Sequence, residues 1–563
     1  MMQDIRYALR MIRRAPLLSA AVILTVALAI AANTAIFSVV NAVLLKPLPF
    51  AEPDRIVQVA EKNDKLKLPS FGSSLLNFVS WREQAQSFTD LAAVGFSSFT
   101  LTGSGEPEQF SGSTISPSLM RVLGLSPILG RAFYDNEEKP GAAAVAMISE
   151  GVWRRRFGSD PSIIGRSVDL NGIPTTIVGI APASLNLISG GDIYTPQTVN
   201  VATEKRLNHQ IITFGRLRPG VSFAQAQAEM NAVSVRVGQQ YPEVRDWGIR
   251  LISLFDTFVP SDLKRGLLVL LFAVGFVLLI ACANIANLLL ARASVRQNEL
   301  AVRTAIGAPR TMLVRQLLVE SVVLSVLGGT IGLLGAFVAV RAINRALPPN
   351  LLPVPSVQMD LTVLWFAVAL TMLTGLLFGL APALRTSRVN INEILKQGSR
   401  SASGAMGGAF RNVLAGGELA LATVLLIGAA LLIQTFANLE HAKLGFNSHG
   451  AITFQLAPPV SKYPLKDKAP QFYRELIDSL QSLPGVSAAA VSTGIPFGQG
   501  SYTSHPMLAV GQTVLPPETL VPIDWRCVSP GYFQTMNIPL LRGRDFTSAD
   551  GSAAPVTIVS QAT

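Results

Sequence analysis

Long apolar stretches alternate with polar segments along the chain of 563 residues. Five of the stretches hold no Lys, Arg, Asp or Glu: residues 15–45, 266–291, 321–340, 361–384 and 419–439. A helix needs about 20 mainly apolar residues to cross a bilayer, and each stretch meets that length. The pattern predicts membrane-spanning helices that lie, with their flanks, at 17–45, 266–291, 317–340, 361–384 and 412–439.

Between the first two helices, residues 46–265 show the shorter periodicities of a folded domain. The predicted strands are 54–60, 144–149, 211–217 and 249–254, the predicted helices are 74–91 and 221–239, and 167–179 is a hairpin. Asn171-Gly172 supplies the positive φ values of the hairpin turn. Ser116 and Pro117 suit the N-cap and first position of another helix, which Gly124 ends.

The last segment, residues 440–563, repeats this plan. It predicts a helix at 471–483 and strands at 451–456, 485–491 and 555–560. Residues 115–133 realign without a gap on 528–546, an offset of 413 (528 − 115). The fold class is therefore a polytopic α-helical membrane protein with α+β exported domains, in which a unit of helix plus domain occurs twice. The second domain is incomplete relative to the first.

Composition and charge fix how this membrane protein is oriented. Only 14% of the residues are charged, against about 25% in soluble proteins. The net charge of +11 lies in residues 1–16, 292–316 and 385–411, which together hold 14 basic and 3 acidic residues (14 − 3 = 11). Loops rich in Lys and Arg stay in the cytoplasm. We therefore expect these three segments inside, and 46–265, 341–360 and 440–563 outside a plasma or inner membrane.

This distribution of charge leaves the lipid bilayer, and no nucleic acid, as the partner of the basic residues. The first apolar stretch could alternatively be a cleaved signal peptide, with small residues at Ala29 and Ala31. It is much longer than the usual apolar region of about 7–15 residues in such peptides. Cys282 falls in a membrane helix and Cys527 is alone outside, so no disulfide is expected within the exported domains.

The basic segment after the second helix predicts a short amphipathic helix. Its apolar side holds Val295, Leu300, Val302 and Ile306, and its polar side holds Arg296, Glu299 and Arg303. Gly307 and Pro309 end the helix before Arg310. One interpretation is a solvated loop helix held at the membrane by its positive charge. The other is a docking surface that receives force from a partner.

Two patterns in the chain resemble a known family. Residues Arg296 to Ala308 read Arg-Gln-Asn-Glu-Leu-Ala-Val-Arg-Thr-Ala-Ile-Gly-Ala. This segment resembles the coupling region of MacB/FtsX-type ABC transporter permeases, with one extra residue between Arg296 and Glu299. The segments Tyr7–Pro16 and Ala32–Phe50 are similar to the duplicated, orphan branch of that family. Permeases of this branch carry two exported MacB-like core domains and eight helices, so the resemblance implies that three helices are lacking here.

The resemblance implies a non-catalytic permease subunit that transmits mechanical force. A separate ABC ATPase would push on Arg296, Glu299, Arg303, Ile306, Gly307 and Arg310, and the exported domains would move. The chain has no G-x-x-x-x-G-K-[ST] loop, so no cofactor is expected on it and ATP is used by the partner. A periplasmic adaptor or another envelope partner is a further expected contact. The implied activity is efflux or export of an unknown substrate.

Other functions remain open at this stage. The same architecture suits a signalling or regulatory module that drives an extracytoplasmic partner without transport. An enzyme is disfavoured, because the four histidines lack zinc spacing and no G-x-S-x-G motif is present. Glu320 and Glu418 lie at the cytoplasmic ends of their helices. We expect the interface to solvate them and Arg315 or Arg411 to pair with them, in preference to a role in proton coupling. Gly328, Gly329, Gly332, Gly335, Gly375 and Gly379 predict close helix packing.

Overall fold

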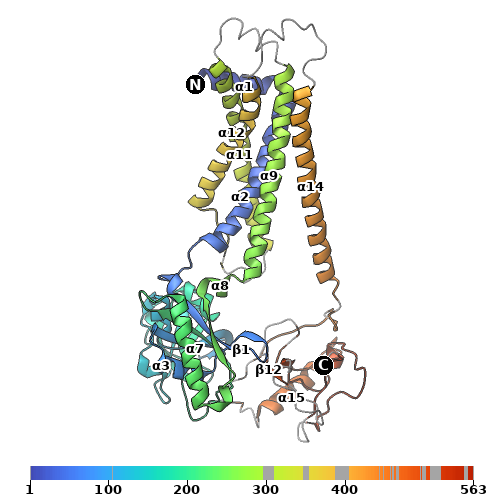
Figure 1. The fold of residues 1–563 in the computed structure, drawn as a ribbon. Helices are drawn as coiled ribbons and strands as arrows, with labels where there is room; N and C mark the ends of the chain where they lie inside the picture. The colour runs from blue at the N-terminus through green and yellow to red at the C-terminus, as the bar shows by residue number, and fades with distance from the viewer. Residues whose placement is uncertain are drawn as a thin grey trace, which may run out of the picture. The chain divides into compact units, whose positions relative to one another are not determined.

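A computed structural model gives the fold (Figure 1). It describes residues 2–103, 106–295, 310–346, 354, 356–386, 405–442, 444–447, 449–456, 458, 462–463, 468–494, 496, 503–506, 522–550 and 556–561. The chain forms two compact units. A helical unit comprises residues 1–47 and 258–442, and a second unit comprises 48–257 and 443–563.

The helical unit contains the predicted membrane helices. Its elements are α1 (Met2–Arg14), α2 (Pro16–Val40), the π-helical turn η1 (Asn41–Leu45), α9 (Ser261–Val295), α11 (Arg310–Ala346), α12 (Leu361–Thr386) and α14 (Ala405–Glu440). Among the described residues, five helices are long and apolar enough to cross a membrane: Pro16–Leu45, Ser261–Leu289, Val314–Ala346, Leu361–Gly379 and Ala415–Glu440. The predicted fold class of a polytopic membrane protein is confirmed. Most of the basic segment 385–411, which the sequence predicts to be a cytoplasmic linker between α12 and α14, lies outside the described residues.

Glycines bring α11 close to two neighbouring helices. A Cβ atom on Gly332 would lie 2.7 Å from the Ala27 carbonyl oxygen of α2, and one on Gly328 would lie 2.7 Å from Val26 Cβ. One residue along from Gly328, a Cβ on Gly329 would meet the Thr371 side chain of α12 at 2.5 Å. These separations are shorter than a real Cβ contact. The prediction that the glycines serve close helix packing is confirmed.

The glycines of α12 make the reverse contact. A Cβ on Gly375 would lie 3.1 Å from Ser325 Cβ, and one on Gly379 would lie 2.8 Å from Leu318 Cδ2, both in α11. The Gly379 contact reaches Leu318 and Ser321, which lie on either side of Glu320 in α11. Glu320 is accordingly only 5% exposed. The expectation that the membrane interface solvates Glu320 is therefore wrong.

The helix α9 joins the same bundle through apolar and polar contacts. Ile285 and Leu289 of α9 pack with Val22, Val26 and Ile30 of α2, Leu324 of α11 and Phe378 of α12 in one buried cluster. In α2, Asn33 Nδ2 donates to the Val274 carbonyl of α9 at 2.9 Å. A hydrogen bond between helices is well suited to a lipid environment, where an unpaired amide has no water to replace it.

The folded domain of residues 48–257 is built on a mixed sheet (Figure 1). Its strands are β1 (Ile56–Asn63), β2 (Leu68–Phe71), β3 (Phe88–Thr102), β4 (Glu108–Ile115), β5 (Leu129–Gly130), β6 (Val145–Ser149), β7 (Ser167–Leu170), β8 (Ile173–Ala181), β9 (Ile193–Pro196), β10 (Ile211–Leu217) and β11 (Gly248–Ser253). The main path through the sheet is β11-β1-β10-β3-β4-β9-β6-β8-β5. Its helices are α3 (Leu75–Gln84), α4 (Leu119–Leu123), α5 (Glu150–Phe157), α6 (Ala183–Ser189), α7 (Phe223–Gln240) and α8 (Leu254–Phe258).

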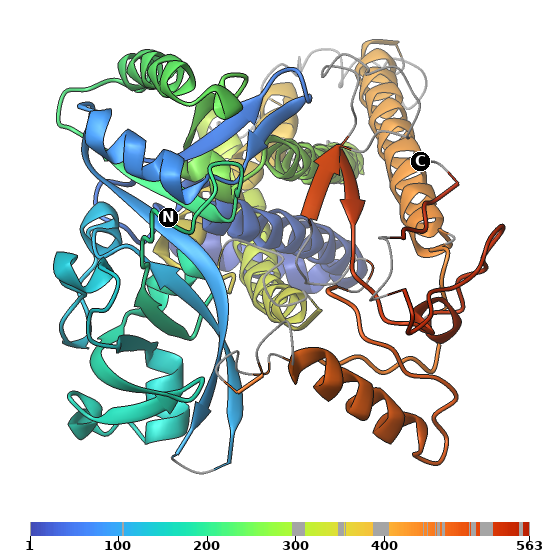
Figure 2. The same cartoon turned by 90° about the horizontal axis from the view of Figure 1, so that it is seen from below.

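Two hydrophobic cores fill this domain, and β3 runs through both. Phe88 and Leu91 belong to the core in which α3 and α7 cover β1, β10 and β11. Phe99 and Leu101 belong to the second core, with β4, β6, β8, β9 and α5. Figure 2 shows β3 as the long pale-blue strand. The two lobes therefore share one continuous strand.

Most sequence predictions for this domain are confirmed, and two are wrong. The Asn171-Gly172 turn joins β7 to β8 with φ values of 56° and 80°. The predicted helix 74–91 ends at Gln84, because Phe88 and Leu91 belong to β3. Helix α4 begins at Leu119 with Ser118 as its N-cap. Ser116 is not the cap, because its hydroxyl instead accepts a hydrogen bond from Ala93 N.

The region from 444 to 561 holds α15 (Lys468–Gln481), α16 (Tyr532–Thr535) and the strand pair β12 (Thr503–Pro506) and β13 (Pro522–Trp525). The predicted helix 471–483 is confirmed as α15. The strands predicted at 451–456 and 485–491 do not form. Of the strand predicted at 555–560, the described residues 556–560 are also not a strand. The apolar alternation is present there, but strands also need hydrogen-bonded neighbours.

The repeat nevertheless recurs at the level of single hydrogen bonds. Ser116 N donates to the Ala93 carbonyl at 2.9 Å, and Ser116 Oγ accepts from Ala93 N at 3.0 Å. Its counterpart Ser529 exchanges the same two bonds with Val491, both at 2.9 Å. Gly124 and its counterpart Asn537 both take left-handed backbone, with φ of 65° and 52°.

A bidentate ion pair also occurs in both copies. Arg131 binds the Glu137 carboxylate at 2.7 and 3.0 Å, and its counterpart Arg544 binds Asp550 with two bonds of 2.7 Å. The hydrogen bond from Arg544 lowers the pKa of Asp550. Burial acts to raise the pKa of Glu137, but the hydrogen bond from Arg131 helps to outweigh it and the pKa is lowered. The duplication predicted from the sequence thus extends to its polar interactions.

The close contact of α11 with α2 gives a first prediction. Gly332→Leu should lower the thermal unfolding midpoint of the purified chain, because the side chain must displace the Ala27 backbone. Overpacking of this kind costs about 1–3 kcal/mol. Gly428→Leu in α14 is the matched control, since nothing lies within 4 Å of a Cβ there. Equal midpoints for the two variants would contradict the proposed packing.

Candidate functional site

The residues predicted to couple the chain to an ATPase lie at the junction of α9 and α11. Arg296, Glu299, Arg303, Ile306 and Gly307 fall outside the described residues. Arg310 is the first residue of α11, and α9 ends at Val295. Their role as a coupling surface therefore stays a prediction. Any force applied to this segment enters directly into two helices of 35 and 37 residues.

At the opposite end of the helical unit, a polar cluster joins α2 to α12. Asn41, the first residue of the π-helical turn η1, donates from Nδ2 to Asp360 Oδ2 at 3.0 Å. Asp360 also caps α12, because its Oδ1 accepts from Val363 N at 3.1 Å. Beside this bond, the ring of Phe37 in α2 stacks on the ring of Phe366 in α12, with centroids 3.8 Å apart. The end of α2 and the start of α12 are thus held together.

The end of α11 is attached to the same cluster. Asn344 donates from Nδ2 to the Val357 carbonyl at 2.8 Å and accepts from Val357 N at 2.9 Å. This pair of bonds fixes the segment just before Asp360, and Val357 is only 2% exposed. Hydrogen bonds therefore join the end of α2 and the end of α11 to the segment that begins α12. A π-helical turn beside such bonds is typical of functional positions in helices.

Past α2, the chain is anchored to the folded domain by a buried arginine. Arg216 of β10 is 9% exposed, donates from Nη2 to the Ala51 carbonyl at 2.6 Å and from Nε to the Val122 carbonyl at 2.8 Å. Desolvation lowers the pKa of Arg216, and the nearby Arg55 adds to this effect. Arg55 itself binds the Leu217 carbonyl through two nitrogens at 2.7 and 3.0 Å. From Ala51 onward the chain is therefore part of the domain.

The two covalent connections to the helical unit leave the domain from adjacent strands. Strand β1 follows α2 along the chain, and β11 precedes α8 and α9. The strands pair in antiparallel register, from Val57 with Ser253 to Lys62 with Gly248. On the open edge of β11, the Gln227 side chain of α7 binds the Ile249 carbonyl at 3.0 Å and Leu251 N at 2.8 Å. The exit strand is thereby fixed on both sides.

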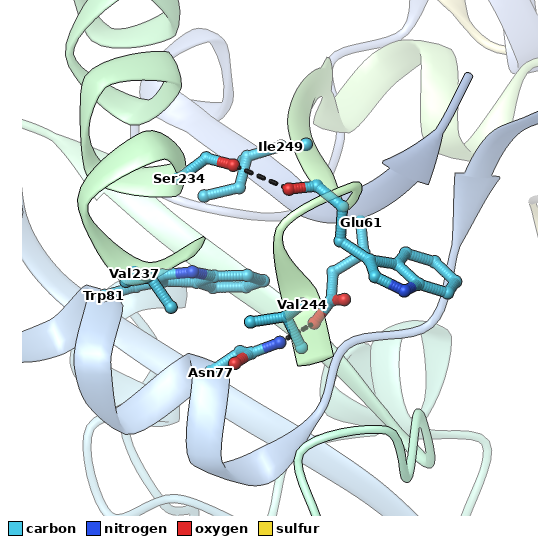
Figure 3. Close-up of a pocket in the computed structure, with 9 residues that line it drawn as sticks. Glu61, Asn77, Trp81, Ser234, Val237, Val244 and Ile249 are labelled. Carbon is cyan, nitrogen blue, oxygen red and sulfur yellow. Dashed lines mark hydrogen bonds between the residues drawn. The ribbon is translucent and has the colours of Figure 1, made fainter. Parts of the chain in front are cut away.

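A small pocket lies beside this strand pair, between α3 and α7 (Figure 3). Glu61 of β1 lines it with a carboxylate that is 1% exposed and accepts from Ser74 N at 2.9 Å and Asn77 Nδ2 at 3.0 Å. On the other side, Ser234 Oγ donates to the Trp247 carbonyl at 2.8 Å. Its remaining lining is mostly apolar, so the pocket offers no set of convergent reactive groups.

The second oxygen of Glu61 faces His209. His209 Nδ1 lies 3.1 Å from Glu61 Oε2, and the ring packs 4.2 Å from that of Trp247. The imidazole is 7% exposed, so the pair is enclosed by the domain. Among the described residues, no three His, Cys, Asp or Glu side chains are grouped so as to hold a metal ion. Glu61, His209 and their neighbours therefore form a buried polar cluster with a structural role.

Sequence reasoning missed Asn41, Asp360, Asn344 and Arg216. In the sequence, Asn41 lies within an apolar span and Asp360 within a short segment expected outside the membrane. The sequence does offer one signal, since Asp360 immediately precedes the apolar run of α12, as an N-cap residue does. Arg216 carries no such signal, because its partners at Ala51 and Val122 are distant in the chain.

Comparisons with known proteins agree with the resemblance. Residues 19–233 match the model of the MacB-like periplasmic core domain, and residues 271–391 match that of the FtsX-like permease C-terminal region. The macrolide export ATP-binding/permease protein MacB of Azoarcus sp. (strain BH72) is 28% identical over 277 residues, which cover 47% of this chain and 39% of that protein. The pyoverdine export ATP-binding/permease protein PvdT of Pseudomonas syringae pv. tomato is 26% identical over 271 residues, with coverages of 47% and 39%.

This chain thus spans about two fifths of the length of the curated relatives it matches. Among solved structures, the periplasmic region of MacB from Actinobacillus actinomycetemcomitans aligns with 36% of this chain and 90% of its own, at 14% identity and a TM-score of 0.28. The extracellular domain of the noncanonic ABC-type transporter YknZ from Gram-positive bacteria covers 35% of this chain and 99% of its own. Its identity is 15% and its TM-score 0.27.

The anchoring of the connector gives a second prediction. Gly124 follows α4 with φ of 65°, and a Cβ there would lie 2.5 Å from Ala51 Cβ. Gly124→Ala should therefore lower the thermal midpoint and increase proteolytic cleavage near residue 51. Gly141→Ala is the control, because Gly141 has φ of 83° but nothing within 4 Å of its Cβ, so only the backbone cost of about 1 kcal/mol applies. The prediction fails if both variants are cleaved and unfold alike.

Proposed function

We propose that this chain, which carries a MacB-like periplasmic core domain and an FtsX-like permease domain, is the permease subunit of an ABC-type export complex that works by transmitting mechanical force. In this proposal an ATPase on a separate chain drives motion of the folded domains outside the membrane. The names of the relatives, which are macrolide and pyoverdine export proteins, favour efflux as the class of activity. The substrate of this chain is left open.

One observation carries the proposal: the bundle is bonded so that force on α11 is passed to α2. The glycine contacts place α11 against α2, and the Asn41–Asp360 bond joins the far end of α2 to α12. Beyond α2, Arg216 holds Ala51 to the folded domain. In this proposal, displacement of α11 is passed to α2 and from there to the connector that Arg216 holds at Ala51.

The topology proposed for this mechanism places the N-terminus, 292–316 and 385–411 in the cytoplasm. The segment from Arg296 to Arg310 then meets the ATPase, and the domain of residues 48–257 lies outside. Since β1 and β11 are neighbours, α2 and α9 act on one place in the sheet. Tilting of the helices would turn the domain as a rigid body. No substrate path through the membrane helices is required.

ATP binding is assigned to another chain. The sequence holds no G-x-x-x-x-G-K-[ST] loop, whose backbone and lysine hold nucleotide phosphates. The curated relatives are named ATP-binding/permease proteins, so their names give both functions to one chain. For this chain we propose the permease part alone, with no cofactor of its own and with an envelope adaptor as a further partner.

The test is co-purification of an ATPase with the detergent-extracted chain. Glu299→Arg combined with Arg303→Glu inverts the charges of the proposed coupling surface and leaves the net charge unchanged. We expect at least a tenfold loss of the co-eluting ATPase, because like charges would face each other across the contact. Binding is measured by mass spectrometry of the eluate under ATP-trapping conditions.

A matched control exchanges another pair at the same spacing. Glu150→Arg combined with Arg154→Glu inverts an exposed i,i+4 pair on α5 of the folded domain. This variant should retain the ATPase. If neither the native chain nor the control captures an ATPase, the permease assignment is overturned, and an anchored signalling module becomes the better explanation. Retention in the coupling variant would remove Glu299 and Arg303 from the contact surface.

A further inference from the structure

The N-terminal helix α1 is separate from the membrane helix that follows it. Ala15, with φ of −132° and ψ of 70°, breaks the helical path, and Pro16 begins α2. Figure 1 shows α1 lying across the end of the helical unit. Its apolar side is already used, because Ala8 and Met11 are 1% and 7% exposed and α1 contacts α11. The helix is therefore attached to the bundle by one face.

The opposite face of α1 is strongly basic. Arg6, Arg10, Arg13 and Arg14 fall at i, i+4, i+7 and i+8, a spacing that places them together on one side of a helix. All four side chains are exposed. Within residues 1–16 only Asp4 opposes them, which leaves this segment with a net charge of +3 (4 − 1). A compact cationic surface thus lies beside the start of a membrane span.

We propose that the arginine face of α1 binds the phosphates of anionic phospholipid headgroups. A guanidinium group donates several hydrogen bonds in a plane, which suits a phosphate better than a lysine does. Arginines near a membrane surface each add about 1 kcal/mol of attraction to anionic lipid. Since α1 packs on α11, headgroups bound there would fix the level of α11 in the bilayer.

The position of the basic face favours lipid over a protein partner. Residues 16–45 form a span of 30 residues directly after α1, so the arginines are held at the depth of the headgroups. The covered face of Ala8 and Met11 means that binding needs no insertion of α1 into the acyl chains. The inference needs only membrane insertion and stands apart from the proposed ATPase.

The experiment titrates phosphatidylglycerol or phosphatidylcholine into the full detergent-solubilised chain and follows the thermal unfolding midpoint. We expect phosphatidylglycerol to raise the midpoint more than phosphatidylcholine does, and 0.5 M salt, a concentration chosen for screening, to remove the difference. The variant Arg6→Gln, Arg10→Gln, Arg13→Gln should need roughly a hundredfold more phosphatidylglycerol for the same shift, at about fivefold per arginine.

The control removes three exposed arginines elsewhere: Arg154→Gln, Arg155→Gln and Arg474→Gln. It should keep the native preference for phosphatidylglycerol. If the α1 variant also keeps that preference, the proposal is wrong. An equal shift with inorganic phosphate would indicate a general anion site and would also overturn it. Loss of a co-purifying protein with lipid preference intact would assign the arginine face to that protein instead.

Discussion

The close approach of α11 to α2 is the constraint on which the helical unit depends. At Gly328 and Gly332 the helices are too close for any side chain, so their backbones are in contact. Lipid tails are as apolar as the side chains of a membrane helix, so the hydrophobic effect does not drive two such helices together. Close packing of matching surfaces must hold them instead. Two surfaces fitted this closely resist sliding. Movement of α11 along its axis must therefore carry α2 with it, or break the fit.

The folded domain is connected to the helical unit through two neighbouring strands. Both of its connections enter through β1 and β11, which are bonded along their length. Edge strands are often weak points, but β11 has its open side satisfied by Gln227 from α7. Beneath β1, the carboxylate of Glu61 is held by Ser74 and Asn77. Polar bonds in a buried site fix geometry, because any displacement leaves a group unpaired.

Sequence reasoning succeeded where the signal was local. The apolar spans and the Asn171-Gly172 turn each depend on residues adjacent in the chain. It failed where distant residues decide the outcome. The apolar residues Phe88 and Leu91 continue the spacing of α3, but pairing with β10 makes them strand. The Asn41–Asp360 bond joins residues 319 positions apart, and no period along the chain could reveal it.

The two copies of the repeat separate these local and distant effects. In the second copy, Ser529 and Arg544 make the same kinds of bonds as Ser116 and Arg131. Ser116 and Ser529 find their partners 23 and 38 residues away, outside the segment that realigns without a gap. The described residues 451–456 and 485–491, which the sequence predicts as strands, are not strands. A short hydrogen-bonded unit can thus keep its geometry without the sheet. In the first copy the same unit supports the connector, since Gly124 packs on Ala51 and Val122 binds Arg216. Its recurrence in the second copy, where residues 451–456 and 485–491 are not strands, indicates that these bonds do not depend on the full sheet of the first copy.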